Sequence, residues 1–86
     1  MPHIKIYTTN FCPYCTMAKN LFKQKGICEW EEIRIDLDFE RRIEMMTKTG
    51  RKSVPQIFIG DTHIGGFDDL NALNRQGALD KLLAEC

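Results

Sequence analysis

The sequence predicts an α/β fold with a mixed four-stranded sheet flanked by helices, in the order β-α-β-α-β-β-α. Two observations lead to this prediction. Segments with the two-residue hydrophobic alternation of strands take turns with segments of helical periodicity. The last two strand segments are separated only by Gly60-Asp61, whereas a helical segment separates the first two. The first pair is therefore expected to be parallel with a right-handed crossover, and the last pair to be an antiparallel hairpin.

The first half of the chain is predicted to contain two strands and two helices. Residues 4–8 and 30–35 alternate apolar and polar side chains and are rich in isoleucine, as strands are. The segments after each strand have helical spacing and end at Gly26 and Gly50, in the position of C-terminal caps. The residues that define the two apolar helix faces are Tyr14, Met17, Ala18, Leu21 and Phe22, then Phe39, Ile43 and Met46.

The second half is predicted to be a hairpin followed by a helix. Residues 56–59 form the third strand, and residues 62–64 form a short fourth strand that Gly65-Gly66 breaks. The last helix is expected to start at Asp68 or its neighbour and to be interrupted at Gly77. Together these elements give the arrangement of the thioredoxin-type fold. The apolar residues of the last helix are Leu70, Leu73, Leu79, Leu82 and Leu83.

Length and composition limit the class of protein. The 86 residues are expected to form one domain, 1–86. Hydrophobic residues make up 43% and charged residues 28%, which favours a globular chain over a disordered one. Twelve basic residues balance twelve acidic ones, so neither nucleic acid nor a membrane surface is expected as a partner. The N-terminus lacks the apolar core of a signal peptide. We therefore expect a monomeric, cytoplasmic protein.

The segment Cys12-Pro13-Tyr14-Cys15 lies where the first strand passes into the first helix. Pro13 suits the first helical turn, because its missing N–H group would have no partner there. Cys12 then becomes the N-cap residue, with its sulfur facing the free N–H groups and the positive end of the helix dipole. Both favour the thiolate, so we expect the pKa of Cys12 to lie well below the free value of about 8.5.

Cys15 follows one turn later and faces the same way. Two cysteines at this helical spacing have Cα atoms about 5–6 Å apart, which suits a disulfide. Cys15 is expected to be more buried than Cys12 and to have the higher pKa. The pair predicts a redox catalyst in which Cys12 attacks a disulfide and Cys15 resolves the mixed disulfide.

Two other interpretations of the cysteine pair remain. A Cys-x-x-Cys segment is also half of a zinc site, but such a site needs four ligands, and the remaining cysteine and histidine residues are scattered. A structural disulfide is the second alternative, although a close pair in a reducing compartment is more often catalytic or metal-binding. We predict no metal site. The scattered residues are Cys28, Cys86, His3 and His63.

Four motifs, in order along the chain, make the sequence resemble the glutaredoxins, specifically the small bacterial dithiol kind. They are Cys12-Pro13-Tyr14-Cys15, Ser53-Val54-Pro55, Gln56-Ile57-Phe58-Ile59 and Gly65-Gly66-Phe67-Asp68-Asp69. The resemblance implies a glutathione-dependent thiol–disulfide oxidoreductase of cell redox homeostasis. Its partners would be glutathione and proteins that contain disulfides or are glutathionylated. Glutathione would be a co-substrate, with no metal or organic cofactor.

The resemblance also implies how glutathione is held. Pro55 would be cis and lie against the cysteine pair, the alternative being a trans proline at the start of an edge strand. Val54 would offer its backbone N–H and C=O groups to the cysteinyl part. The N-terminus of the last helix suits a carboxylate, and Asp68 or Asp69 suits the ammonium group, the alternative being that both acids only cap the helix. The implied contacts are Tyr14, Arg42, Ser53, Val54, Pro55, Gly66, Phe67, Asp68 and Asp69.

The sequence departs from the family pattern at Thr9, where many members carry a lysine three residues before the first cysteine. Lys19, Arg42 or Arg51 would have to supply the positive charge. Ser53 replaces the commoner threonine, with little effect expected on backbone contacts. Several remaining residues are expected to have no part in the chemistry. Met45, Met46 and Trp30 are expected in packing, His3 and His63 on the surface, and Cys28 and Cys86 as bystanders.

Two other functions are compatible with the motifs. An iron–sulfur carrier would hold a [2Fe–2S] cluster between Cys12 and glutathione in two subunits, but Pro13 stiffens the loop and disfavours it. A redoxin recharged by thioredoxin reductase is the other alternative, and the Gly-Gly-Phe-Asp-Asp segment favours glutathione over it.

Overall fold

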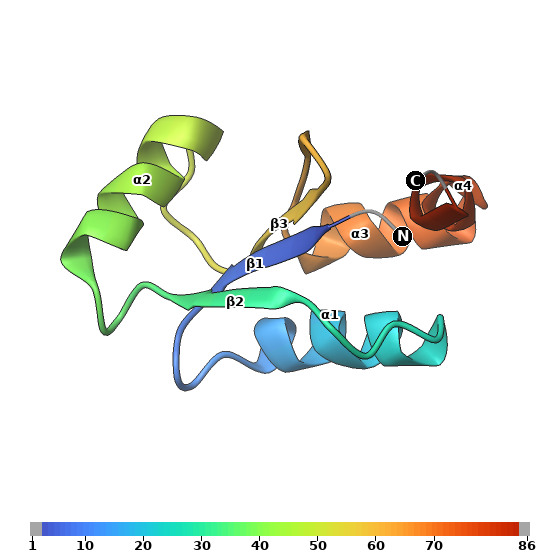
Figure 1. The fold of residues 1–86 in the computed structure, drawn as a ribbon, viewed down its shortest axis with the longest axis horizontal. Helices are drawn as coiled ribbons and strands as arrows, with labels where there is room; N and C mark the ends of the chain where they lie inside the picture. Colours follow the sequence, from blue (N-terminus) through green and yellow to red (C-terminus); the bar gives the residue numbers. More distant parts are fainter. Residues whose placement is uncertain (1–2, 85–86) are drawn as a thin grey trace.

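The computed structural model describes residues 3–84, in which four strands and four helices follow one another in the order β1-α1-β2-α2-β3-β4-α3-α4 (Figure 1). None of these helices is both long and apolar enough to cross a membrane. The strands are β1 (Ile4–Thr8), β2 (Glu31–Arg34), β3 (Gln56–Ile59) and β4 (Thr62–Gly65). The helices are α1 (Pro13–Gln24), α2 (Phe39–Thr49), α3 (Phe67–Arg75) and α4 (Ala78–Ala84).

The strands form one mixed sheet in the order β2-β1-β3-β4. The pair β1 and β2 is parallel, and β3 and β4 form an antiparallel hairpin, as predicted. The antiparallel pair of β1 and β3 joins the two halves, with Ile6 opposite Ile57. This is the predicted α/β fold of thioredoxin type. Because β1 lies inside the sheet, the loop that follows it is held at a fixed place.

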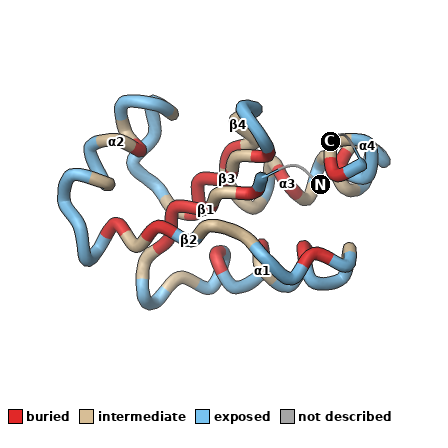
Figure 2. The backbone as a smooth tube through the Cα atoms, in the orientation of Figure 1, coloured by how far each residue is buried: buried red, intermediate tan, exposed pale blue. Residues whose placement is uncertain are grey.

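The larger core lies between the sheet and α1, α3 and α4 (Figure 2). Alternate residues of the two central strands point into it and meet fully buried side chains of the helices. Trp30 packs against this core, as predicted. The buried members are Ile4, Ile6, Ala18, Leu21, Phe22, Ile27, Ile57, Ile59, Leu70, Leu79 and Leu83.

Helix α2 packs on the sheet through a second, smaller core and lies apart from the other helices (Figure 1). Met45 is fully buried there and Met46 partly, which confirms their predicted packing role. The Tyr7 hydroxyl donates a hydrogen bond of 2.5 Å to Glu44, which also accepts from Arg41. Burial, together with the Glu44 carboxylate, raises the pKa of Tyr7. One buried thioether and one hydrogen bond thus hold α2 on the sheet.

Three elements differ from the sequence prediction in their bounds. Strand β4 extends to Gly65, which was predicted to break it. The last helix is divided in two, because Gly77 has φ +76 and α4 starts at the next residue. Strand β2 is shorter than residues 30–35, although the Ile35 N–H still donates to the Thr8 carbonyl oxygen at 2.9 Å. The start of α2 was not located by the prediction. Its N-cap is Asp38, whose carboxylate accepts from the N–H groups of Glu40 and Arg41.

Replacing Met45 by alanine is expected to lower the free energy of unfolding by about 2–5 kcal/mol, because a fully buried side chain leaves a cavity. Ile43→Ala in the same helix is the matched control, since Ile43 is 46% exposed and its loss should change stability by about 0.5 kcal/mol or less. Chemical denaturation midpoints of the two variants measure the difference. Equal losses would contradict the assignment of Met45 as the anchor of α2.

Candidate active site

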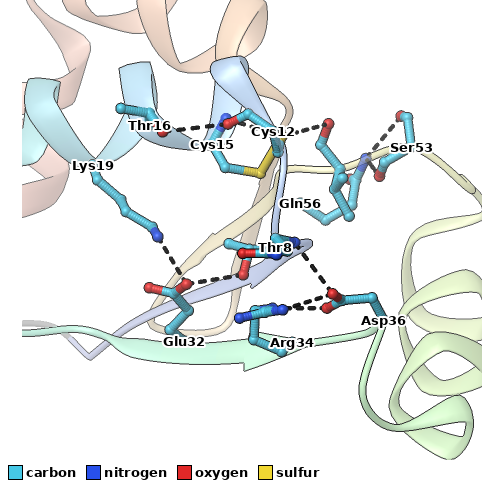
Figure 3. Close-up of a disulfide and its surroundings, with 12 residues drawn as sticks. Thr8, Cys12, Cys15, Thr16, Lys19, Glu32, Arg34, Asp36, Ser53 and Gln56 are labelled. Carbon is cyan, nitrogen blue, oxygen red and sulfur yellow. Dashed lines mark hydrogen bonds and ion pairs between the residues drawn. A yellow bond between two sulfur atoms is a disulfide. The ribbon is translucent and has the colours of Figure 1, made fainter.

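The Cys12 sulfur lies at the N-terminus of α1, as predicted (Figure 3). Cys12 has extended backbone angles (φ −136, ψ 96), and its sulfur accepts the backbone N–H of Cys15 at 3.1 Å. Pro13 occupies the first turn, and the N–H of Thr16 donates to the Cys12 carbonyl oxygen at 3.1 Å. The sulfur therefore meets a free N–H group and the positive helix end, which both stabilise a thiolate.

Cys12 and Cys15 form a disulfide, with their Cα atoms 5.2 Å apart. Cys15 is 2% exposed, whereas Cys12 is only partly buried, as the sequence predicted. A substrate sulfur approaching from solvent therefore reaches Cys12 first. The buried Cys15 is placed to attack Cys12 from the protein side.

The peptide bond between Val54 and Pro55 is cis, which confirms what the resemblance implied. The Val54 carbonyl oxygen lies 3.8 Å from the Cys12 sulfur. The loop before β3 thus lies directly against the cysteine pair (Figure 3). A ligand that pairs with the Val54 backbone would have its own sulfur close to Cys12.

A chain of hydrogen bonds behind this loop was not predicted. Gln56 is fully buried, and its amide nitrogen donates to the Ser53 carbonyl oxygen at 2.9 Å. Its amide oxygen lies 2.8 Å from Nε2 of His63 on the neighbouring strand β4. Because an amide oxygen only accepts, Nε2 of His63 carries the proton. The pair of side chains fixes the backbone of Ser53 next to Val54.

His63 is half-buried, so its predicted surface position is wrong. Its ring lies on Phe58, with ring centroids 5.0 Å apart. Burial, together with the charge of Arg51, lowers the pKa of His63. Sequence alternation could not reveal this, because the partners Gln56 and Phe58 belong to another strand. His3, by contrast, is exposed and pairs with Glu31 at 2.8 Å, in agreement with its predicted surface position.

The N-terminus of α3 forms the opposite wall of the site. The Gly66 N–H donates to Oδ2 of Asp69 at 2.9 Å, and Nη1 of Arg51 donates to the same oxygen at 2.9 Å. The hydrogen bond from Arg51, followed by that from Gly66, lowers the pKa of Asp69. Gly65 has φ +116, and a Cβ there would lie 2.8 Å from the Asp69 carboxyl carbon. Only glycine fits this turn.

These walls enclose a cleft of about 280 Å³ beside the cysteine pair. All the glutathione contacts that the resemblance implied line it, with the exception of Arg42. Arg42 is exposed on α2 and does not belong to the lining, whereas Arg51 does. Tyr14 and Phe67 line the cleft together with Pro55, and their rings stack, with centroids 6.5 Å apart. The lining residues are Tyr14, Arg51, Ser53, Val54, Pro55, Gly66, Phe67, Asp68 and Asp69.

The positive charge of Lys19 is already paired with the carboxylate of Glu32. Its ammonium group donates to Glu32 at 2.7 Å, and the same carboxylate oxygen accepts from the buried Thr8 hydroxyl at 3.0 Å (Figure 3). Burial works against ionisation of Glu32, but the hydrogen bonds from Lys19 and Thr8 outweigh it and lower its pKa. Among the three cations that the sequence offered in place of a lysine at Thr9, only Arg51 lines the cleft.

The loop between β1 and α1 is tied to the end of β2. The Asn10 N–H donates to Asp36 at 3.3 Å, and Arg34 makes two further bonds to that carboxylate. The guanidinium group of Arg34 lowers the pKa of Asp36 to about 2, so the carboxylate stays charged. These bonds fix the loop that carries Cys12 and leave Phe11 92% exposed beside it.

The remaining cysteines lie away from this site or outside the described structure. Cys28 is an exposed free thiol in the loop before β2. Cys86 lies outside the described residues. Within residues 3–84, no three His, Cys, Asp or Glu side chains gather as a metal-binding group.

Comparison with known proteins gives one consistent family. The family model for glutaredoxin matches residues 4–64. The chain is 52% identical to a glutaredoxin of Neisseria meningitidis over 83 residues, which covers 96% of this chain and 98% of that protein. It is 49% identical to glutaredoxin 3 of Escherichia coli K12, over 96% of this chain and 99% of that protein.

Solved structures agree with the sequence comparisons. The structure of a buckwheat glutaredoxin–glutathione complex superposes with a TM-score of 0.89 at 32% identity, over 99% of this chain and 79% of that one. The solution structure of a Brucella melitensis glutaredoxin gives a TM-score of 0.83 at 49% identity, over 96% of this chain and 89% of that one.

The lowered pKa of His63 predicts a pH-dependent stability. At pH values between that pKa and the ordinary value of 6.5, His63 is protonated in the unfolded chain but not in the folded one. The free energy of unfolding is therefore expected to fall as the pH drops from about 7.5 to about 5.5, above the ordinary range of carboxylates. His63→Gln keeps a hydrogen-bond donor but does not titrate. Denaturant titrations should give this variant a shallower pH slope, and an identical slope would refute the role of His63.

Proposed function

The chain belongs to the glutaredoxin family, and we propose that Cys12 attacks and Cys15 resolves while glutathione binds in the cleft beside Pro55. Its activity is that of a glutathione-dependent thiol–disulfide oxidoreductase. The observation that carries the assignment of roles is the Cys12 sulfur at the start of α1, bonded to the Cys15 N–H and more exposed than the Cys15 sulfur.

The first reaction is the reduction of a protein disulfide. The Cys12 thiolate attacks one sulfur, so a Cys12–substrate disulfide forms and the other substrate sulfur leaves as a thiolate that takes up a proton. Cys15 loses its proton and attacks the Cys12 sulfur, which forms the Cys12–Cys15 disulfide and releases the second substrate thiol. Two glutathione thiolates then reduce this disulfide in succession and leave as glutathione disulfide.

The second reaction removes glutathione from a protein thiol and needs only Cys12. The Cys12 thiolate attacks the glutathionyl sulfur, and the protein thiolate leaves and is protonated. A second glutathione thiolate attacks the glutathionyl group on Cys12, releases glutathione disulfide and restores the Cys12 thiolate. In this route the N-terminus of α1 stabilises the sulfur both as nucleophile and as leaving group.

Glutathione has one ammonium group and two carboxylates, and the cleft offers a partner for each kind of group. The Val54 backbone pairs with the cysteinyl part and directs its sulfur toward Cys12, 3.8 Å from the Val54 oxygen. The N-terminus of α3 receives a carboxylate, and Asp68 or Asp69 receives the ammonium group. The buckwheat protein, whose structure contains glutathione, supports a site for this ligand in the shared fold.

Arg51 binds a glutathione carboxylate in place of the predicted Arg42. Arg51 lines the cleft and uses Nη1 to bind Asp69. A guanidinium group has further N–H donors that remain for a ligand. The position of Arg42 on the exposed side of α2 favours Arg51 over it.

The protein is further proposed to act as one domain, 1–86, and as a monomer in the cytoplasm. Its protein substrates would be disulfide-containing or glutathionylated proteins of that compartment. A catalytic cysteine pair with a partly exposed first cysteine suits a reducing environment, because glutathione is available there as reductant.

Substitution of each cysteine separates the two roles. Cys12→Ser is expected to reduce activity to the uncatalysed background with every substrate, because no nucleophile remains. Cys15→Ser should stay within about threefold of the wild type on a small glutathione mixed disulfide, since glutathione itself resolves Cys12. The assay couples glutathione, glutathione reductase and NADPH oxidation. Appreciable activity of Cys12→Ser would show that the roles are assigned wrongly.

A matched pair of arginine variants tests the carboxylate contact. Arg51→Gln is expected to raise KM for glutathione about fivefold to tenfold, because one charge-assisted hydrogen bond is lost. Arg42→Gln should change KM by less than about twofold. Initial rates at varied glutathione concentration give both values. A larger effect at Arg42 would restore the assignment that the resemblance implied.

A further inference from the structure

A second hollow lies between α1 and α3. Its volume is about 310 Å³. Phe67 lines both this groove and the glutathione cleft, and its ring stacks with that of Tyr14, which lines the cleft. The groove is lined by Met17, Asn20, Leu21, Gln24, Phe67, Asn71 and Asn74.

The lining contains no charged residue, although 28% of the chain is charged. It consists of an apolar floor and four carboxamides. Asn71 and Asn74 are half-buried, and the side chains of all four make no hydrogen bond within residues 3–84. A carboxamide both donates and accepts, so these groups match the N–H and C=O groups of an extended polypeptide.

Large apolar side chains are exposed where the groove meets the active site. Phe11 is 92% exposed, Tyr14 56% and Met17 44%. Single exposed apolar residues are ordinary, but these three follow one another from the Cys12 loop along α1 toward the groove. A methionine at such a place adapts its shape to different partners.

We propose that the groove between α1 and α3 binds an uncharged, extended segment of the protein substrate next to its reacting cysteine. This inference rests on the proposed function, because the substrate sulfur must reach Cys12. It adds a second binding surface to the glutathione cleft, with a different chemistry. A charged side chain in the groove would lose water without gaining an ionic partner, so uncharged segments are preferred.

The distances along α1 set which substrate residues are involved. With a rise of 1.5 Å per residue, Met17 and Gln24 lie about 8 and 18 Å from Cys12 along the helix axis. An extended peptide advances about 3.3 Å per residue. Substrate residues roughly two to five positions from the reacting cysteine therefore reach the groove.

Asn71→Asp tests the inference, since it keeps the shape of the side chain and adds one charge to the groove. The substrates are the mixed disulfide of glutathione with 2-mercaptoethanol and a glutathionylated peptide with about five uncharged residues on each side of its cysteine. Two further peptides carry either lysine or aspartate at the third position on each side. Gln76→Glu is the matched control, because this exposed carboxamide is the C-cap of the same helix and does not line the groove.

Asn71→Asp is expected to lower kcat/KM for the uncharged peptide about threefold to tenfold. It should leave kcat/KM for the small mixed disulfide unchanged, which also shows that the variant is folded. With Asn71→Asp, kcat/KM for the lysine peptide should rise relative to that for the aspartate peptide. Gln76→Glu should give the same values as the wild type.

Three results would overturn the inference while leaving the proposed function intact. They are an unchanged kcat/KM for the uncharged peptide, an equal loss with the small mixed disulfide, and the same response to lysine and aspartate peptides. If the wild type fails to turn over even the small mixed disulfide with glutathione, the proposed function itself fails, and the inference with it.

Discussion

The hydrogen bond from the Cys15 N–H to the Cys12 sulfur is the interaction on which the active site depends. It exists only because Cys12 ends the loop after β1 and at the same time caps α1. Pro13 contributes by having no N–H group of its own to compete for the sulfur. The hydrogen bonds from Asn10 and Arg34 to the Asp36 carboxylate tie the loop that carries Cys12 to the end of β2. Backbone geometry at the start of α1 thus favours the thiolate form that we propose for Cys12.

The glutathione cleft depends on long-range contacts that connect segments far apart in the chain. Gln56 and His63 hold the Ser53 backbone, and Arg51 joins the same loop to Asp69 of α3. Gly65 permits this close approach, since any side chain there would overlap the Asp69 carboxylate. The cis-proline loop and the helix start are therefore fixed relative to each other before a ligand arrives. A prearranged cleft loses less conformational entropy on binding.

Local signals predicted most of the fold, and contacts between distant segments account for what was missed. The N-cap position of Cys12 and the directions of the strand pairs follow from residues adjacent in sequence. The position of Arg42 outside the cleft depends on how α2 packs through Met45, which no local pattern encodes. His63 alternates like a surface residue, but its partner Gln56 lies on another strand. Only the Asp38 cap had a local signal, an acid just before a helical run, that the prediction overlooked.

The two binding surfaces proposed beside Cys12 would suit an enzyme that accepts two unlike partners at one sulfur. Glutathione is small and charged, and the cleft proposed for it contains Arg51, Asp68 and Asp69. A polypeptide is long and variable, so fixed charges would exclude many sequences, whereas carboxamides and a methionine tolerate them. Both partners must present a sulfur at the same point, which requires the two surfaces to converge. Phe67 of α3 lines both of them, and its ring stacks with Tyr14 of α1.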